Sequence, residues 1–101
     1  MIEGREQLFD RAENLWGTRS QLMMVCEEAG ELIKEVGKIY RGKVEHDGLV
    51  DEIADMTIML AQLQRMMSIS QEQIESRIQK KLERLEYIIR EMDAGNGVRV
   101  I

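Results

Sequence analysis

Two acidic pairs are the residues in this chain best suited to chemistry. Glu28 pairs with Glu31 and Glu52 pairs with Asp55, and each pair is spaced by three positions within a strongly helical stretch. Residues at that spacing project from one face of a helix, so each pair presents two carboxylates together. Converging carboxylates repel one another unless a cation binds between them, and hard divalent ions prefer oxygen ligands. The spacing predicts a site for Mg²⁺, or alternatively Mn²⁺, of the kind that commonly serves phosphate chemistry.

The position of Glu52 on its helix sets it apart from the other acids. At about 100° per residue, Glu52 falls about 60° from the centre of an apolar stripe, whereas Asp55 falls about 120° away. A partly buried carboxylate needs a cation or strong hydrogen-bond donors to stay charged. No Lys or Arg lies between Val44 and Gln64. A metal, or a basic side chain from another helix, is therefore the expected partner, unless both pairs simply lie on solvated faces.

The elements that must position these acids are helices. The 101 residues contain no proline and only 4% aromatic residues, and residues that favour helix dominate. We expect an all-α fold resembling a four-helix bundle, in a single domain over residues 1–101. A chain this short buries a limited core, so an oligomer is also expected. The expected helices cover residues 3–16, 19–40, 48–67 and a fourth segment between Ser70 and Gly95.

Local signals refine these helices. Ser70 with Gln73 fits a capping box that starts the fourth helix. Thr18 or Ser20 is a candidate cap for the second helix, and Asp47 is a candidate cap for the third. The last four residues, 98–101, are expected to form either a strand-like arm or a mobile end.

Three single residues have a structural and a functional interpretation. Cys26 lies on an apolar stripe and is expected to be a small buried hydrophobe. Trp16 is expected to pack in a core or an interface, although an aromatic face could also stack on a nucleobase. His46, the only histidine, is expected to be exposed in a loop.

Charge and cysteine content exclude several classes of protein. The formal net charge of −5 argues against a nucleic-acid-binding domain, which needs a basic face. A nucleotide ligand remains compatible, because bound cations reverse the local sign. A single cysteine forms no internal disulfide, and no apolar run approaches the length of a membrane span. We therefore expect a cytoplasmic protein without a membrane partner.

The sequence around the acidic pairs resembles the MazG-like superfamily of all-α nucleotide pyrophosphohydrolases. The run Glu27-Glu28-Ala29-Gly30-Glu31, then twenty residues, then Glu52-Ile53-Ala54-Asp55 fits its E-E-x-x-E…E-x-x-D pattern. The resemblance is best over residues 20–63. It implies a helical bundle that dimerises, often into a tetramer, and Mg²⁺-dependent cleavage of a nucleoside triphosphate to the monophosphate and pyrophosphate.

The resemblance also implies roles for individual residues. Its metal ligands correspond to Glu28, Glu31, Glu52 and Asp55. Glu27 would be an outer ligand or would orient the attacking water, so Glu27 and Glu31 are the candidate catalytic residues, with the general base left open.

Basic residues downstream of the first acidic pair could reach a substrate phosphate. Lys38 and Arg41 are the main candidates for these contacts. The alternative is that both are solvated charges on the helix surface.

Two other functions stay open. A phosphoribosyl-ATP pyrophosphatase would bind metal in the same way. Residues 56–59, however, lack the aromatic-His pair expected of that branch of the superfamily. A non-catalytic helical interaction module would suit the densely charged fourth helix. A di-iron bundle is disfavoured, because it needs Glu-x-x-His motifs and the residue three before His46 is Lys43.

Overall fold

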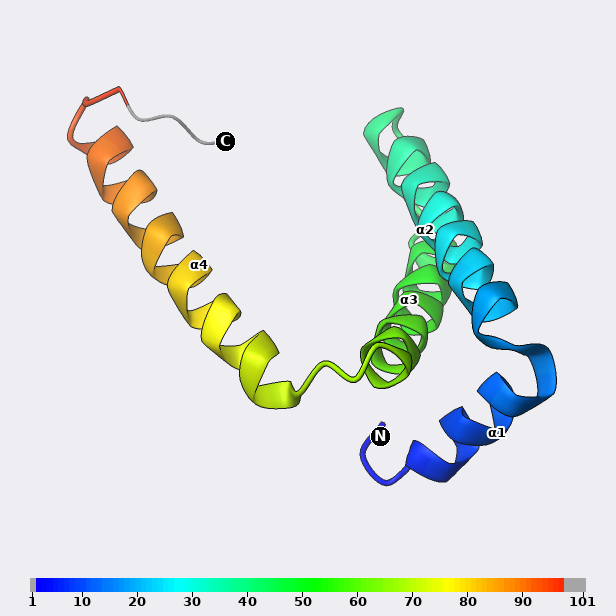
Figure 1. Ribbon diagram of the computed structural model, residues 1–101. Helices are drawn as coiled ribbons and strands as arrows, with labels where there is room; N and C mark the ends of the chain where they lie inside the picture. The colour runs from blue at the N-terminus through cyan, green and yellow to red at the C-terminus, as the bar shows by residue number, and fades with distance from the viewer. Residues whose placement is uncertain (1, 98–101) are drawn as a thin grey trace. The chain divides into compact units, whose positions relative to one another are not determined.

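The computed structural model describes residues 2–97, and every regular element in that range is a helix. The predicted all-α class is therefore confirmed. The first helix begins three residues later than predicted, because Gly4 has a φ of +79° and interrupts the chain before it. The expected arm at residues 98–101 lies outside the described range. The helices are α1 (Glu6–Trp16), α2 (Thr18–Tyr40), α3 (Asp47–Met66) and α4 (Gln71–Asp93) (Figure 1).

The chain separates into two compact units at the end of α3. The first unit covers residues 1–68 and holds α1, α2 and α3, and the second covers residues 69–101 and holds α4. The bundle arrangement and the single domain over residues 1–101 stay predictions.

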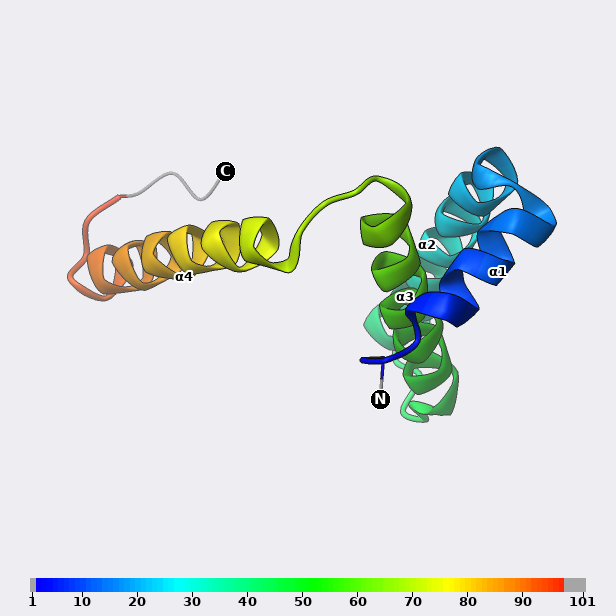
Figure 2. The same cartoon turned by 60° about the horizontal axis from the view of Figure 1, so that its bottom comes forward.

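In the first unit, α2 and α3 form an antiparallel hairpin, and α1 packs against both (Figures 1 and 2). An ion pair ties α1 to α3. Nε of Arg65 lies 2.7 Å from Oδ1 of Asp10, and Nη2 lies 2.8 Å from Oδ2. This two-pronged contact lowers the pKa of Asp10 through its hydrogen bond with the guanidinium.

A buried hydrogen bond between two glutamines defines the register of the hairpin. The side-chain amide of Gln62 donates a hydrogen bond of 3.1 Å to Oε1 of Gln21, and both side chains are buried. Seven residues further along α2 lies Glu28, and seven residues back along α3 lies Asp55. Steps of seven return to the same face of a helix. Antiparallel pairing at the glutamines therefore places Glu28 opposite Asp55.

We expect truncation of Gln62 to alanine to lower the free energy of unfolding by about 1–3 kcal/mol, because buried Gln21 loses its donor. Urea unfolding of the variant measures this change. The double replacement of Gln21 and Gln62 by leucine is the control. It should recover much of the loss, because neither buried polar group is then left without a partner. Equal stability of wild type and Gln62→Ala would contradict the role given to this contact.

The turn between α2 and α3 depends on Gly42. Its φ of +107° ends α2, and the amides of Gly42 and Lys43 donate to the carbonyls of Ile39 and Lys38. This is the pattern of a Schellman motif. The turn reverses the chain and brings the acidic residues of the two helices together.

Both predicted side-chain caps in the first unit were wrong. Asp47 is the first residue of α3 and not its cap, and no side chain caps that end. Thr18 lies inside α2, where its hydroxyl donates to Oε2 of Glu13 at 2.6 Å. Asp47 stabilises the start of α3 by its charge and not as a cap, because an acidic residue in the first turn interacts favourably with the helix dipole.

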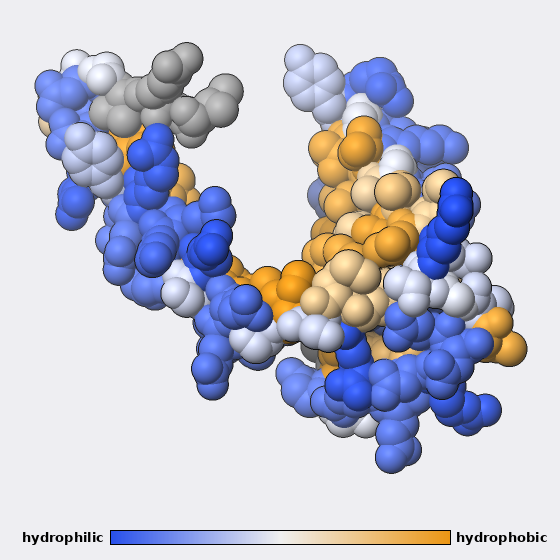
Figure 3. All heavy atoms as spheres, in the orientation of Figure 1, coloured by the Kyte–Doolittle hydropathy of each residue, from blue (hydrophilic) through white to orange (hydrophobic). Residues whose placement is uncertain are grey.

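The apolar stripes of α2 and α3 lie largely at the surface of the unit (Figure 3). Ile33 is 71% exposed, and Ile53 and Leu60 are each 50% exposed. Cys26, which we predicted to be buried, is exposed as well. The prediction was wrong because the helices meet along the face that carries Gln21 and Glu28, beside the apolar stripe. The stripe is left available for another surface.

In the second unit, the predicted capping box of α4 is confirmed. The hydroxyl of Ser70 accepts from the amide of Gln73, and the side chain of Gln73 accepts from the amide of Ser70. Gly95, with a φ of +82°, ends the helix.

None of the helices within residues 2–97 has the length and apolar character that a membrane span requires. The half-exposed apolar residues of α4 are Ile78, Leu82, Leu85, Ile89 and Met92.

Candidate metal centre

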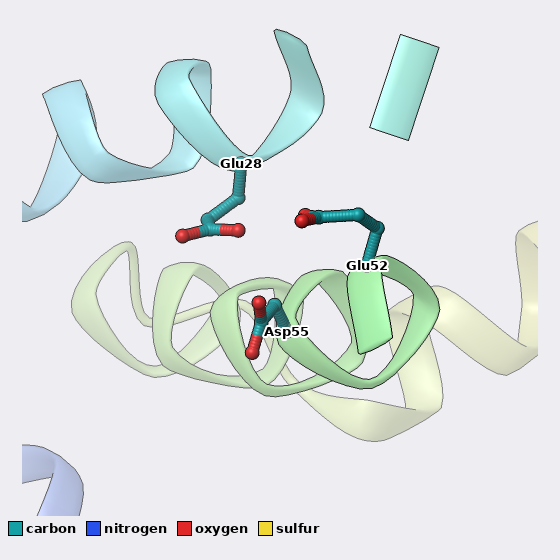
Figure 4. A group of neighbouring side chains, drawn as sticks. All are labelled: Glu28, Glu52 and Asp55. Carbon is teal, nitrogen blue, oxygen red and sulfur yellow. The ribbon is translucent and has the colours of Figure 1, made fainter. Parts of the chain in front are cut away.

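Three carboxylates from two helices converge in the first unit. Glu28 reaches across from α2, and Glu52 and Asp55 rise from adjacent turns of α3 (Figure 4). One oxygen of each carboxylate lies within 4.8 Å of the other two. The convergence follows from the antiparallel register, which places Glu28 opposite Asp55, and from the spacing of Glu52 and Asp55 on one face.

The environment of Glu52 disfavours a negative charge. Its side chain is half-buried, and its Oε2 is shielded from solvent with no hydrogen-bond partner. Burial raises the pKa of Glu52, and the neighbouring carboxyl of Glu28 and the charges of Asp55 and Glu31 raise it further. The expectation of a partly buried carboxylate at this position is therefore confirmed.

Among residues 2–97, no basic side chain neutralises the group. Within the part of the chain that is described, no Lys or Arg forms an ion pair with Glu28, Glu52 or Asp55. Close carboxylates without counter-charge are unstable unless they share a proton or bind a cation. The three oxygens could hold an ion such as Mg²⁺, which is bound by a few carboxylates and keeps the rest of its coordination sphere for water or phosphate.

The other two predicted acids lie outside this group. Glu31 is exposed on α2, although its charge is near enough to contribute to the raised pKa of Glu52. Glu27 is also exposed, and the structure does not bring it into the group. Glu31 is therefore the closer of the two to the shared site.

The candidate phosphate-binding residues point to other partners. Nζ of Lys38 lies 3.0 Å from Oε1 of Glu35, and Nζ of Lys43 lies 3.5 Å from Oε2 of the same carboxylate. The guanidinium of Arg41 lies over Gly37, where an added Cβ would be 3.3 Å from Nη1. Neither Lys38 nor Arg41 forms an ion pair with the three converging acids.

Glu35 is the site residue that our sequence analysis did not single out. Its side chain is only 13% exposed, and the hydrogen bond from Lys38 lowers its pKa. The signal for it was its spacing, because Glu35 follows Glu28 by seven residues and shares its face of α2. Glu35 is paired with lysines, so this face of α2 has a neutralised end and an acidic end without counter-charge.

Trp16 lines an apolar cavity of about 710 Å³ between α1 and α3, with Leu8, Phe9 and Ile58 among its other walls. The tryptophan is 55% exposed, so the packing we expected for it is not present within this unit. His46 is exposed, as predicted. Ile58 follows Asp55 by three residues, and the cavity therefore begins on the face of α3 that carries the acids.

The fold and the site define an all-helical protein with an acidic centre shared by two antiparallel helices. The chain matches no family model, no curated protein and no solved structure.

Proposed function

We propose that the protein is a Mg²⁺-dependent pyrophosphohydrolase that cleaves a nucleoside or deoxynucleoside triphosphate to the monophosphate and pyrophosphate. The observation that carries this proposal is the convergence of Glu28, Glu52 and Asp55, which have no basic partner among the described residues. The resemblance of residues 20–63 to MazG-like enzymes supports the choice of substrate. Mn²⁺ is an alternative ion for the same oxygen ligands.

The three converging acids would hold the metal, and Glu31, close by on α2, would complete the set of ligands. The bound ion would supply charge neutralisation at the phosphates and a water of lowered pKa. Glu31 and Glu27 are the proposed residues that orient the attacking water and accept its proton. Positioning and charge stabilisation are expected to dominate, since phosphoryl transfer leaves little covalent work to the protein.

Binding of the anionic phosphates of the substrate requires positive groups that the acidic centre lacks. We propose Lys38 and Arg41 as phosphate contacts, because both lie near the end of α2, beyond the acidic residues of the same helix. Lys38 would then exchange its contact with Glu35 for a phosphate oxygen. The side chain of Lys38 is 37% exposed, and it can make such an exchange at small cost because exposed ion pairs are weak.

We also propose that the protein acts as a homodimer or homotetramer in the cytoplasm. Half-exposed apolar stripes on α2, α3 and α4 support association, because burying apolar surface is the main favourable term in it. Association would complete the bundle that the sequence predicts.

A pyrophosphate-release assay across the common nucleoside and deoxynucleoside triphosphates tests the activity. With Mg²⁺ or Mn²⁺ we expect equal amounts of monophosphate and pyrophosphate, and EDTA should abolish both. Phosphoribosyl-ATP belongs in the panel as well. Cleavage of that substrate alone would identify the protein as a phosphoribosyl-ATP pyrophosphatase.

A non-catalytic interaction module is the second candidate, and the exposed apolar face of α4 favours it. This candidate predicts no effect of Mg²⁺ or Mn²⁺ on the melting temperature. Two results together would reject the enzyme and support the interaction module. These are no pyrophosphate release from any substrate in the panel and no metal-dependent rise in melting temperature.

A further inference from the structure

The side chain of Glu35 on α2 lies directly beside Gly48 in the first turn of α3. A Cβ placed on Gly48 would lie 2.8 Å from Oε2, 3.0 Å from Cδ and 3.1 Å from Oε1 of Glu35. The whole carboxyl group therefore occupies the space that any other side chain at position 48 would need. Real Cβ atoms do not approach a heavy atom as closely as 2.8 Å, so any larger residue at position 48 would require the carboxyl group of Glu35 to shift.

This contact lies on the same face and in the same register as the acidic centre. Glu35 follows Glu28 by seven residues on α2, and Gly48 precedes Asp55 by seven on α3. The pair Gln21 and Gln62 lies seven residues away in the other direction. The three converging acids are thus held between two fixed contacts, a buried amide pair at one end and the Glu35–Gly48 contact at the other.

The two lysines explain why a carboxylate can occupy this position. Lys38 and Lys43 each pair with one oxygen of Glu35, and the carboxyl group is largely shielded from solvent. These contacts hold the group against the first turn of α3, where the helix dipole also favours a negative charge. Oε2 of Glu35 accepts no hydrogen bond, but both lysines lie at ion-pair distance from the carboxylate, so its charge is compensated. A compensated charge suits a structural role and not metal ligation.

We propose that Glu35 and Gly48 are positioning residues for the metal centre, fixing the separation and register of α2 and α3 so that Glu28 faces Glu52 and Asp55. The inference rests on the proposed function, because it concerns the same acidic centre. Metal sites need their ligands held within fractions of an ångström, and residues that orient ligands affect affinity almost as much as the ligands do.

The test compares Gly48→Ala with Gly30→Ala. Both glycines lie inside helices, but a Cβ at Gly30 meets no atom within 4 Å. The Mn²⁺ concentration that gives half of the maximal thermal stabilisation should rise about tenfold in Gly48→Ala. It should change by less than about twofold in Gly30→Ala, which adds only an ordinary helix-favouring residue. Circular dichroism checks that both variants keep their helices.

A compensating change separates positioning from loss of folding. Aspartate at position 35 is shorter by one methylene, so Gly48→Ala combined with Glu35→Asp makes room for the added methyl group. We expect the double variant to recover most of the metal affinity. Unchanged affinity in Gly48→Ala would overturn the proposal, because the carboxyl of Glu35 would then have moved aside without consequence. So would a double variant that remains as weak as Gly48→Ala.

The wild-type protein distinguishes this failure from failure of the proposed function. If Mn²⁺ and Mg²⁺ do not stabilise the wild type, the metal centre itself is rejected and the positioning role with it. If the wild type responds and Gly48→Ala responds at the same concentration, only the positioning role is rejected.

Discussion

Replacement of Glu52 by glutamine is expected to abolish pyrophosphate release while making the metal-free protein more stable than wild type at neutral pH. Glutamine keeps the shape of the side chain but removes the charge that the half-buried position disfavours. The same change removes a central metal ligand, so we expect activity to fall at least about 100-fold. A gain in stability with a loss of activity is typical of a residue retained for function.

The pH dependence of stability follows from the raised pKa of Glu52. Burial is the main cause, and the neighbouring carboxyl of Glu28 is the next. A raised pKa means that the folded state binds a proton more tightly than the unfolded state, whose ordinary value is 4.5. The resulting contribution to the free energy of unfolding is fully present below pH 4.5. It is lost as the pH rises through the raised pKa of Glu52 in the folded protein.

Melting temperatures from pH 4 to 8 in EDTA measure this difference. The gap between Glu52→Gln and wild type should widen in favour of the variant as pH rises above about 4.5. Asp10 and Glu35 have lowered pKa values and act in the opposite sense, but they are present in both proteins and cancel in the comparison. Addition of Mg²⁺ should stabilise the wild type and leave the variant unchanged.

Asp51→Asn is the matched control for Glu52→Gln. Asp51 is the preceding residue of α3, is exposed and lies outside the three converging acids. We expect this variant to keep its activity and the pH profile of the wild type. Wild-type activity in Glu52→Gln, or equal losses in both variants, would remove Glu52 from the proposed site.

The convergence of acids could be predicted from sequence because it depends on local geometry. A spacing of three places Glu52 and Asp55 on one face whatever the rest of the fold does. The turn at Gly42 then makes the two long helices antiparallel neighbours, which brings Glu28 across to them. Helix ends were predictable for the same reason wherever a backbone signal was strong, as at Ser70 and Gly95.

Contacts that depend on the choice of helix face could not be predicted in this way. From the sequence, the apolar stripe with Cys26 was expected to be buried. In the structure, the first unit instead buries the face with Gln21. Periodicity identifies an apolar face but not the surface that covers it, and a chain can reserve that face for a partner. The pairing of Glu35 with two lysines could not be predicted, because it depends on the conformations of long side chains.

Leu85→Glu is expected to convert the protein from an oligomer to a monomer. Leu85 lies at the centre of the apolar stripe of α4 and is 50% exposed in the chain. In an interface formed by this stripe, an unpaired carboxylate would cost several kcal/mol, which weakens association at least about 100-fold. The helix itself should be unaffected, because leucine and glutamate favour helix to a similar degree.

Ser76→Glu is the matched control, because it adds the same charge to α4 about 180° around the helix from Leu85. Light scattering after size-exclusion chromatography gives the mass of each variant, and Ser76→Glu should retain the mass of the wild type. A monomeric wild type, or a Leu85→Glu variant that still associates, would contradict the use of α4 in assembly. If the monomeric variant also loses pyrophosphate release while binding Mn²⁺ normally, a second subunit must supply part of the nucleotide pocket. That result would explain why the first unit holds the acids for the metal but leaves its apolar face open.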